Sequence, residues 1–235
     1  MSPEWERFYA DGSSFSIGTY PYLEKLVGMF VKEAPRMLEL GSGLGCEIPY
    51  FSMYMKFGYH GVDGSTSAVM RLQNIYGWLA GRLKLADFTK EIPFDGPFDF
   101  VVDRASIPHN ELVDIRSCLK LVYEKLSPGG ILICSDWFSD AHSEVGRGQE
   151  ISQGTRGGYP DGQFRQAGKV HFSSEDELAD LFKDFEFLYL EERITRRVGP
   201  GKALEQVIGF PWISAEYRKQ DYRSSVWDIV VRKPV

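Results

Sequence analysis

The sequence has 235 residues, 43% of them hydrophobic and 26% charged, which is typical of a folded soluble domain and unlike a disordered or fibrous chain. Its formal net charge of -6 gives no overall basic field for nucleic acid or an anionic membrane. No apolar run reaches the length of about 18 residues that a membrane span needs. A single α/β domain over residues 1–235 is expected, because such domains run to about 250 residues before a chain divides.

Three cysteines, Cys46, Cys118 and Cys134, occur without the CxxC spacing of metal or redox motifs. They are too few for a disulfide framework, which predicts free thiols and a reducing cytoplasm. From Arg193 to the last residue, nine basic residues accompany four acidic ones. We interpret this local excess as a solvated surface, with a patch for an acidic acceptor as the alternative.

Residues 1–32 form an aromatic N-terminal cap without an apolar signal core. Two interpretations are open: a lid over a cofactor and an acceptor, or a staple that holds a helix to a sheet. From Arg36 onward, short apolar runs alternate with helical periodicity, the pattern of a parallel α/β sheet. Strands are expected at residues 37–40, 60–62, 83–86, 98–102, 131–134, 186–197 and 226–231.

Apolar stripes between these strands predict helices over residues 48–55, 69–79 and 112–126. Ser65 or Thr66 is expected to cap the second of these helices. A capping box formed by Ser174 and Glu177 predicts one more helix. Residues 139–168 are a Gly-rich polar insertion outside this pattern, and a structureless loop of that length is usually functional or disordered.

A glycine-rich loop follows the first strand, with the sequence ELGSGLG at residues 39–45. Its glycines allow the backbone to approach a ligand closely, although such a loop is often only a tight turn. Asp63 follows the second strand, twenty residues beyond Gly43, where a carboxylate suits the two hydroxyls of a ribose. Asp87 and Phe88 follow the third strand and are expected to flank a purine base. Asp103 ends the fourth strand; for each aspartate alone, a helix cap or loop turn is the alternative.

These motifs resemble those of the class I S-adenosylmethionine-dependent methyltransferases over roughly residues 36–233. The matching segments are ELGSGLG, VDGS at 62–65, ADF at 86–88, FDFVVDRAS at 98–106 and LSPGGILI at 126–133. The resemblance implies a three-layer α/β sandwich with a seven-stranded, mostly parallel sheet. Its strand order would be 3-2-1-4-5-7-6, with strand seven antiparallel.

The resemblance also implies S-adenosylmethionine as the cofactor. The methionine and ribose portion would contact the glycine loop, through Glu39, Gly41, Ser42, Gly43 and Gly45. The ribose would bind at Asp63, Gly64 and Ser65, and adenine would lie between Asp87 and Phe88. The backbone around Asp103 and Arg104 would hold the amino acid end.

Two other functions are compatible with part of this pattern. A nicotinamide-binding oxidoreductase uses the same strand, glycine turn and distant acid, but its GxGxxG spacing requires glycine where this chain has Cys46. A protein that binds S-adenosylmethionine without turnover would keep the same fold. Methyl transfer is favoured over both.

Methyl transfer needs a general base only when the acceptor must lose a proton, and histidine suits neutral pH. His109 is the candidate catalytic residue, because the segment DRASIPHN follows the fourth strand; the alternative is that it packs or caps the next helix. His142 and His171 border the polar insertion and are weaker candidates for lining an acceptor pocket. His60, beside the second strand, is interpreted as structural.

The acceptor is expected to be a small molecule. The chain has no Asn-Pro-Pro-Tyr type tetrapeptide for amino groups of adenine and no Pro-Cys pair for cytosine, so nucleic acid is not an expected partner. No cysteine cluster or closely spaced set of His and acidic residues predicts a metal site. The identity of the acceptor, the methylated atom and the oligomeric state do not follow from the sequence.

Overall fold

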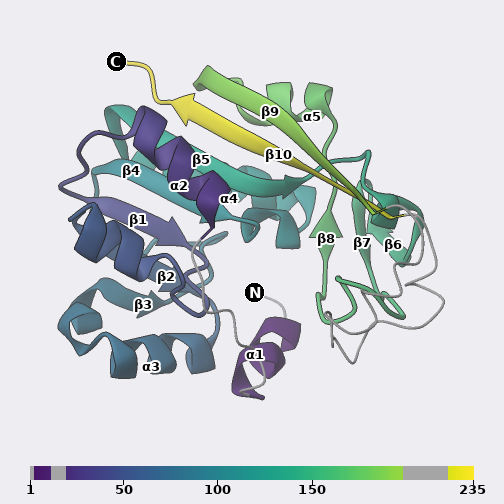
Figure 1. The fold of residues 1–235 in the computed structure, drawn as a ribbon, viewed down its shortest axis with the longest axis horizontal. Coiled ribbons are helices and arrows are strands. Elements are labelled where there is room, and N and C mark those ends of the chain that lie inside the picture. The colour runs from purple at the N-terminus through teal and green to yellow at the C-terminus, as the bar shows by residue number, and fades with distance from the viewer. Residues whose placement is uncertain (1–2, 12–19, 198–221) are drawn as a thin grey trace.

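The computed structural model describes residues 3–11, 20–197 and 222–235, which form a three-layer α/β arrangement beside a smaller sheet (Figure 1). Within these residues the main sheet has seven strands in the order β3-β2-β1-β4-β5-β10-β9. The strands are β1 (Met37–Leu40), β2 (Tyr59–Asp63), β3 (Leu83–Leu85), β4 (Phe98–Arg104), β5 (Leu126–Phe138), β9 (Glu186–Arg197) and β10 (Tyr222–Arg232).

The expected strand order is confirmed, because β9 and β10 are the sixth and seventh strands of this sheet in chain order. β10 pairs antiparallel with both β5 and β9, whereas β1 to β5 pair in parallel. The carboxyl ends of the parallel strands therefore meet at one edge of the sheet. All of the predicted strands are present, and β5 starts five residues earlier than Ile131, at Leu126.

Helices cover both faces of the sheet, which explains why the central strands are apolar at nearly every position. On one face α2 (Pro21–Phe30) and η1 (Pro49–Tyr54) pack against Phe100 and Val102 of β4. On the other face α4 (Leu112–Lys125) and α5 (Glu175–Leu181) pack against Val101. Figure 1 shows α2 in front of the sheet and α4 behind it.

Two of the predicted helices differ from expectation in local geometry. The segment expected as a helix over 48–55 is a π-helical turn, because the N–H of Met55 bonds the carbonyl of Tyr50, five residues back. The helix capped by Ser65, α3 (Thr66–Ile75), ends before the last residues of its predicted stripe. Tyr76 leaves the helical region with φ -113° and ψ 56°, and the 3₁₀ segment η2 (Gly77–Arg82) follows.

The polar insertion at 139–168 contains regular structure. It includes the 3₁₀ turn η4 (Ser143–Gly146) and the strands β6 (Gln149–Ser152) and β7 (Thr155–Gly157), which form a small sheet with β8 (Val170–His171). Buried aromatic side chains such as Phe138, Phe164 and Phe172 pack in a separate cluster there.

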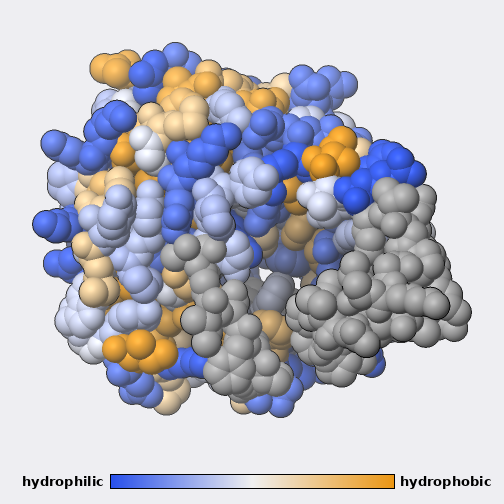
Figure 2. All heavy atoms as spheres, viewed as in Figure 1, coloured by the Kyte–Doolittle hydropathy of each residue, from blue (hydrophilic) through white to orange (hydrophobic). Residues whose placement is uncertain are grey.

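The small sheet and the N-terminal helix α1 (Pro3–Ala10) both lie beyond the carboxyl ends of the parallel strands (Figure 1). In the same view the surface is hollowed between the main sheet and the small sheet (Figure 2). Residues 1–2 and 12–19 of the expected N-terminal cap, and 198–221 of the basic C-terminal part, lie outside the described residues.

Candidate functional site

The glycine loop connects the end of β1 to η1 and is held by the end of β2. The N–H groups of Gly41 and Ser42 donate to the carbonyl oxygen of Val62 at 2.8 and 3.2 Å. Gly41, Gly43 and Gly45 have φ values of +66°, +48° and +71°. Because side chains strain this left-handed region, the loop needs glycine for its backbone path as well as for ligand access.

Side chains from elsewhere in the chain lie directly above this loop. A Cβ atom on Gly43 would lie 2.7 Å from the hydroxyl oxygen of Tyr9. A Cβ atom on Gly41 would meet the side chain of Ser106 and come 3.8 Å from the ring of Phe88. An added side chain at either position would therefore collide with the residues above this loop, the glycine cradle.

Asp63 is buried and ties the glycine loop to the start of α3. Its Oδ2 atom accepts from the N–H of Gly43 at 2.8 Å, and its Oδ1 atom accepts from the N–H of Ser65, beyond Gly64, at 2.8 Å. Burial raises the pKa of this carboxyl, and the two N–H donors oppose that rise. The cap of α3 itself is Ser65, whose Oγ accepts from the N–H of Ala68 at 3.1 Å.

Asp87 and Phe88 follow β3 beside the same cradle. The Oδ1 atom of Asp87 accepts from both the N–H and the hydroxyl of Thr89, at 3.1 and 2.7 Å. Lys90 lies 3.2 Å from its other oxygen. These bonds fix the turn after β3, and the turn places the Phe88 ring against Gly41.

Asp103 is the second-last residue of β4, lies opposite Leu40 of β1 and is fully buried. Its Oδ1 atom accepts from the N–H groups of Ser106 and Ile107, at 3.1 and 3.0 Å. Its Oδ2 atom has no hydrogen-bond partner within the described part of the chain. Burial raises the pKa of Asp103 to about 7. One oxygen of this carboxyl therefore caps the turn after β4, and the other can accept a further hydrogen bond.

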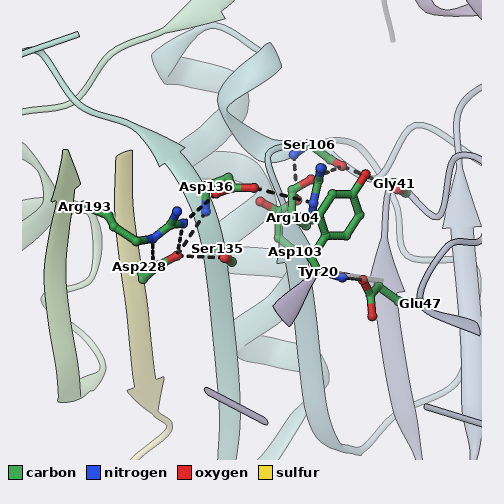
Figure 3. Close-up of polar contacts among 10 residues, drawn as sticks. All are labelled: Tyr20, Gly41, Glu47, Asp103, Arg104, Ser106, Ser135, Asp136, Arg193 and Asp228. Atoms are coloured by element: carbon green, nitrogen blue, oxygen red, sulfur yellow. Dashed lines mark hydrogen bonds and ion pairs between the residues drawn. The ribbon is translucent and has the colours of Figure 1, made fainter. Parts of the chain in front are cut away.

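Arg104 projects toward charged residues that the sequence analysis did not single out (Figure 3). Its guanidinium lies over the Tyr20 ring, 3.1 Å from the centroid, and its Nε atom is 3.5 Å from Oδ2 of Asp136. Asp136 lies near the end of β5 with φ +57° and also binds Arg193. A signal existed, because an acidic residue in the fifth strand continues the series formed by Asp63, Asp87 and Asp103.

Two buried glutamates flank the glycine loop. Glu39 accepts a short hydrogen bond from the hydroxyl of Tyr59, and burial raises its pKa to about 8. Glu47, which the sequence analysis missed, accepts from the N–H of Tyr20 at 2.7 Å through Oε1. Its Oε2 atom has no partner among the residues described, and burial raises its pKa to about 7.

His109 lies in the 3₁₀ turn η3 (Ile107–His109) after β4. Its Nδ1 atom is 2.8 Å from the carbonyl oxygen of Lys169. A carbonyl only accepts, so Nδ1 carries the proton and Nε2 carries the lone pair of the neutral ring. Aromatic rings of Trp5, Phe138 and Phe164 surround it, with centroids 4.8, 5.2 and 6.2 Å away, and burial lowers its pKa to about 4.

The other histidines are less suited to act as a base. His142 and His171 contact other residues through both ring nitrogens, and His60 lies near the opposite end of the strands. His142 accepts from the N–H of Glu144 at 3.1 Å and contacts Gln163 through Nε2. His171 links Thr155 to Glu177. His60 lies near the amino end of β2, where its Nδ1 donates to the carbonyl of Gly58 at 2.9 Å.

The arrangement fits the expected cofactor in two respects. The glycine loop presents backbone without Cβ atoms. Among the described residues Ser42, Glu47 and Asp103, which lie in the loop, just after it and near the end of β4, each have a buried oxygen without a hydrogen-bond partner. Over the described ranges, no group of three or more His, Cys, Asp or Glu side chains could hold a metal ion. No helix in those ranges is long and apolar enough to span a membrane.

The chain is similar to known methyltransferases. Residues 20–192 match the model of a protein family described as a methyltransferase domain. The chain is 29% identical to phosphoethanolamine N-methyltransferase 1 of Zea mays over 137 residues, covering 57% of this chain and 26% of the maize protein. The chain therefore spans about a quarter of the length of that curated relative.

Solved structures share the fold at low sequence identity. A putative methyltransferase of Haloferax volcanii, in complex with the activator Trm112, has a TM-score of 0.68 at 17% identity, covering 99% of this chain and 96% of that one. An S-adenosylmethionine-dependent methyltransferase of Methanosarcina mazei gives 0.63 at 17%, covering 93% and 99%. TehB of Haemophilus influenzae gives 0.61 at 15%, covering 97% and 67%.

Proposed function

Because the chain belongs to the methyltransferase domain family and its cofactor is S-adenosylmethionine, we propose that it methylates a small-molecule acceptor with His109 as general base. When bound, S-adenosylmethionine supplies a methyl group made electrophilic by a positively charged sulfur. The tasks left to the chain are to bind and orient the reactants, exclude water and remove a proton from the acceptor.

The residues that would hold the cofactor surround the glycine loop. Each carboxylate oxygen of Asp63 already accepts one N–H and keeps a further lone pair for a ribose hydroxyl. Phe88 offers a ring beside Gly41 for the base. The spare oxygen of Asp103 and the guanidinium of Arg104 suit the charged amino acid end. Glu39 supports the loop from beneath by bonding Tyr59.

One observation carries the assignment of His109: the carbonyl of Lys169 fixes its tautomer. With Nδ1 donating to that carbonyl, Nε2 is the only ring atom that accepts a proton. The lowered pKa keeps the ring neutral at physiological pH, which is the form a base requires. The three surrounding aromatic rings give the partly buried imidazole an apolar environment.

We propose that the acceptor binds next to His109 and is a small molecule. Trp5 and Phe164 approach the imidazole from α1 and from the insertion, so little room is left for a folded protein. The maize relative is named for methylation of phosphoethanolamine, which makes that compound the first acceptor to test. A cytoplasmic location stays a prediction from the cysteine content.

The test is transfer of label from methyl-labelled S-adenosylmethionine to phosphoethanolamine and then to fractionated small metabolites. We expect His109→Gln to lower turnover by about 100-fold or more while the affinity for S-adenosylhomocysteine, measured by calorimetry, changes little. His60→Gln serves as the control, because His60 lies near the other end of the strands. Unchanged turnover in His109→Gln would show that His109 is not the general base. If the protein binds the cofactor but transfers no label to any fraction, it is a binding protein and not a methyltransferase.

A further inference from the structure

Helix α1 contacts separate parts of the site through neighbouring side chains. The carboxylate of Glu6 accepts from the hydroxyls of Ser65 and Ser67, each at 2.6 Å, and from the N–H of Ser67 at 3.3 Å. Trp5 packs edge-on against His109 with centroids 4.8 Å apart. The next turn of the helix places Tyr9 above Gly43. One short helix therefore touches α3, the turn after β4 and the glycine loop.

The hydroxyl of Tyr9 lies over the glycine loop on a partly exposed side chain. It would lie 2.7 Å from a Cβ on Gly43, yet it makes no hydrogen bond to any residue that the structure describes. Burial, with the nearby charge of Asp63, raises the pKa of Tyr9, so the hydroxyl keeps its proton and remains a donor. A protonated phenol hydroxyl beside the carboxylate of Asp63 suits a ligand that bonds to both.

We propose that Tyr9 binds the cofactor through its hydroxyl and that Glu6 is the positioning residue that brings Tyr9 to the site. The chemistry that suits the pair is a ribose hydroxyl, which donates to Asp63 and accepts from Tyr9. This inference rests on the proposed function only in taking S-adenosylmethionine as the ligand of the glycine loop.

Glu6 is suited to hold α1 in place. Hydrogen bonds from Ser65 and Ser67 lower its pKa, so it is ionised at neutral pH. Its negative charge lies at the N-terminal end of α3, where the helix dipole favours an anion. Glu4 provides a matched control, because it lies on the same helix and pairs with the exposed Arg7 at 3.0 Å.

The first measurement is calorimetric titration with S-adenosylhomocysteine. We expect Tyr9→Phe and Glu6→Gln each to weaken binding by about 3- to 10-fold, the worth of one hydrogen bond, and Glu4→Gln to leave it unchanged. In the double variant the two losses should not add, because Glu6 acts through Tyr9. Additive losses, or unchanged affinity in both single variants, would overturn the proposal.

The second measurement is the rate of trypsin cleavage after Arg7, followed by mass spectrometry, since cleavage requires α1 to leave the site. Glu6→Gln should be cleaved faster than wild type. S-adenosylhomocysteine should slow cleavage of the wild type, because coupling between the two events is reciprocal. Faster cleavage with the ligand would mean that Tyr9 competes with it, which contradicts the proposal. Neither measurement uses an acceptor. If the wild-type protein shows both responses but transfers no methyl group to any acceptor, the proposed function fails and this inference stands.

Discussion

The guanidinium of Arg193 on β9 holds the buried carboxylate of Asp228 on β10, with Nε 2.7 Å from Oδ2. The side chain of Asp228 is only 1% exposed, and its Oδ1 atom accepts from the hydroxyl of Ser135 at 2.7 Å. The same guanidinium donates to Asp136 at 2.7 Å. This pair joins the two C-terminal strands to the charged residues at the end of β5.

Removing Arg193 should destabilise the fold strongly. Arg193→Met leaves the charge of Asp228 buried and uncompensated, which typically costs about 3 kcal/mol or more of the free energy of unfolding. Arg232→Met is the matched control, because Arg232 pairs with Glu186 on the same two strands at the surface. The control should lose about 1 kcal/mol at most. Urea unfolding measures both, and equal losses would contradict this account of Asp228.

Glu47 should make stability depend on pH. Its folded-state pKa, about 7, lies above the ordinary 4.5, so stability is fully present below pH 4.5 and is lost as the pH rises through 7. Glu47→Gln keeps an acceptor for the N–H of Tyr20 and does not ionise. We therefore expect melting temperatures of variant and wild type to converge at pH 5 and the variant to melt higher at pH 8.

Glu33→Gln is the control for this experiment, since Glu33 is exposed and follows α2 nearby. Its difference from wild type should be the same at both pH values. A Glu47→Gln difference that is also independent of pH would mean that Glu47 does not carry the linkage.

Asp63→Asn should lower ligand affinity more strongly than Ser65→Ala, which removes a helix cap. Asp63→Asn replaces one of two accepting oxygens with a donor, which disturbs the glycine loop and removes the charge offered to ribose. We expect affinity for S-adenosylmethionine to fall by about 10- to 100-fold. Ser65→Ala should cost about 1 kcal/mol of stability through the lost cap, and, because its hydroxyl also holds Glu6, it should weaken ligand binding by no more than Glu6→Gln does. Calorimetry beside thermal melting distinguishes the two, and unchanged affinity in a destabilised Asp63→Asn protein would refute the ribose contact.

Gly41 should tolerate no side chain. Gly41→Ala would force a Cβ against Ser106 at a φ of +66°, which alters the loop where the ligand approaches. We expect loss of S-adenosylhomocysteine binding and a lower melting temperature. Gly81→Ala meets open space and should be neutral or slightly stabilising. Normal ligand binding by Gly41→Ala would show that the cradle is not the cofactor site.

Much of the fold could be predicted because it depends on local signals. Alternating apolar runs mark the strands, and a serine with the right spacing caps α3. The glycines of ELGSGLG marked the loop after β1, and the structure places them at positive φ. The acids at the carboxyl ends of β2 and β4 were also visible, since each comes directly after the apolar run that predicted its strand. Strand order came from resemblance to a family, because periodicity does not say which strands are neighbours.

The rest depended on segments that meet only when the chain folds. The sequence placed His109 after β4, but the carbonyl that fixes its tautomer belongs to Lys169, 60 residues away. Glu6 and Ser65 are 59 residues apart, and nothing local relates them. The sequence by itself determined which residues form strands, turns and the glycine loop, because backbone preference and apolar periodicity are properties of short segments. Only the tertiary structure decided the partners of Asp228, His109 and Glu6, because hydrogen bonding of buried polar groups is satisfied across packed surfaces.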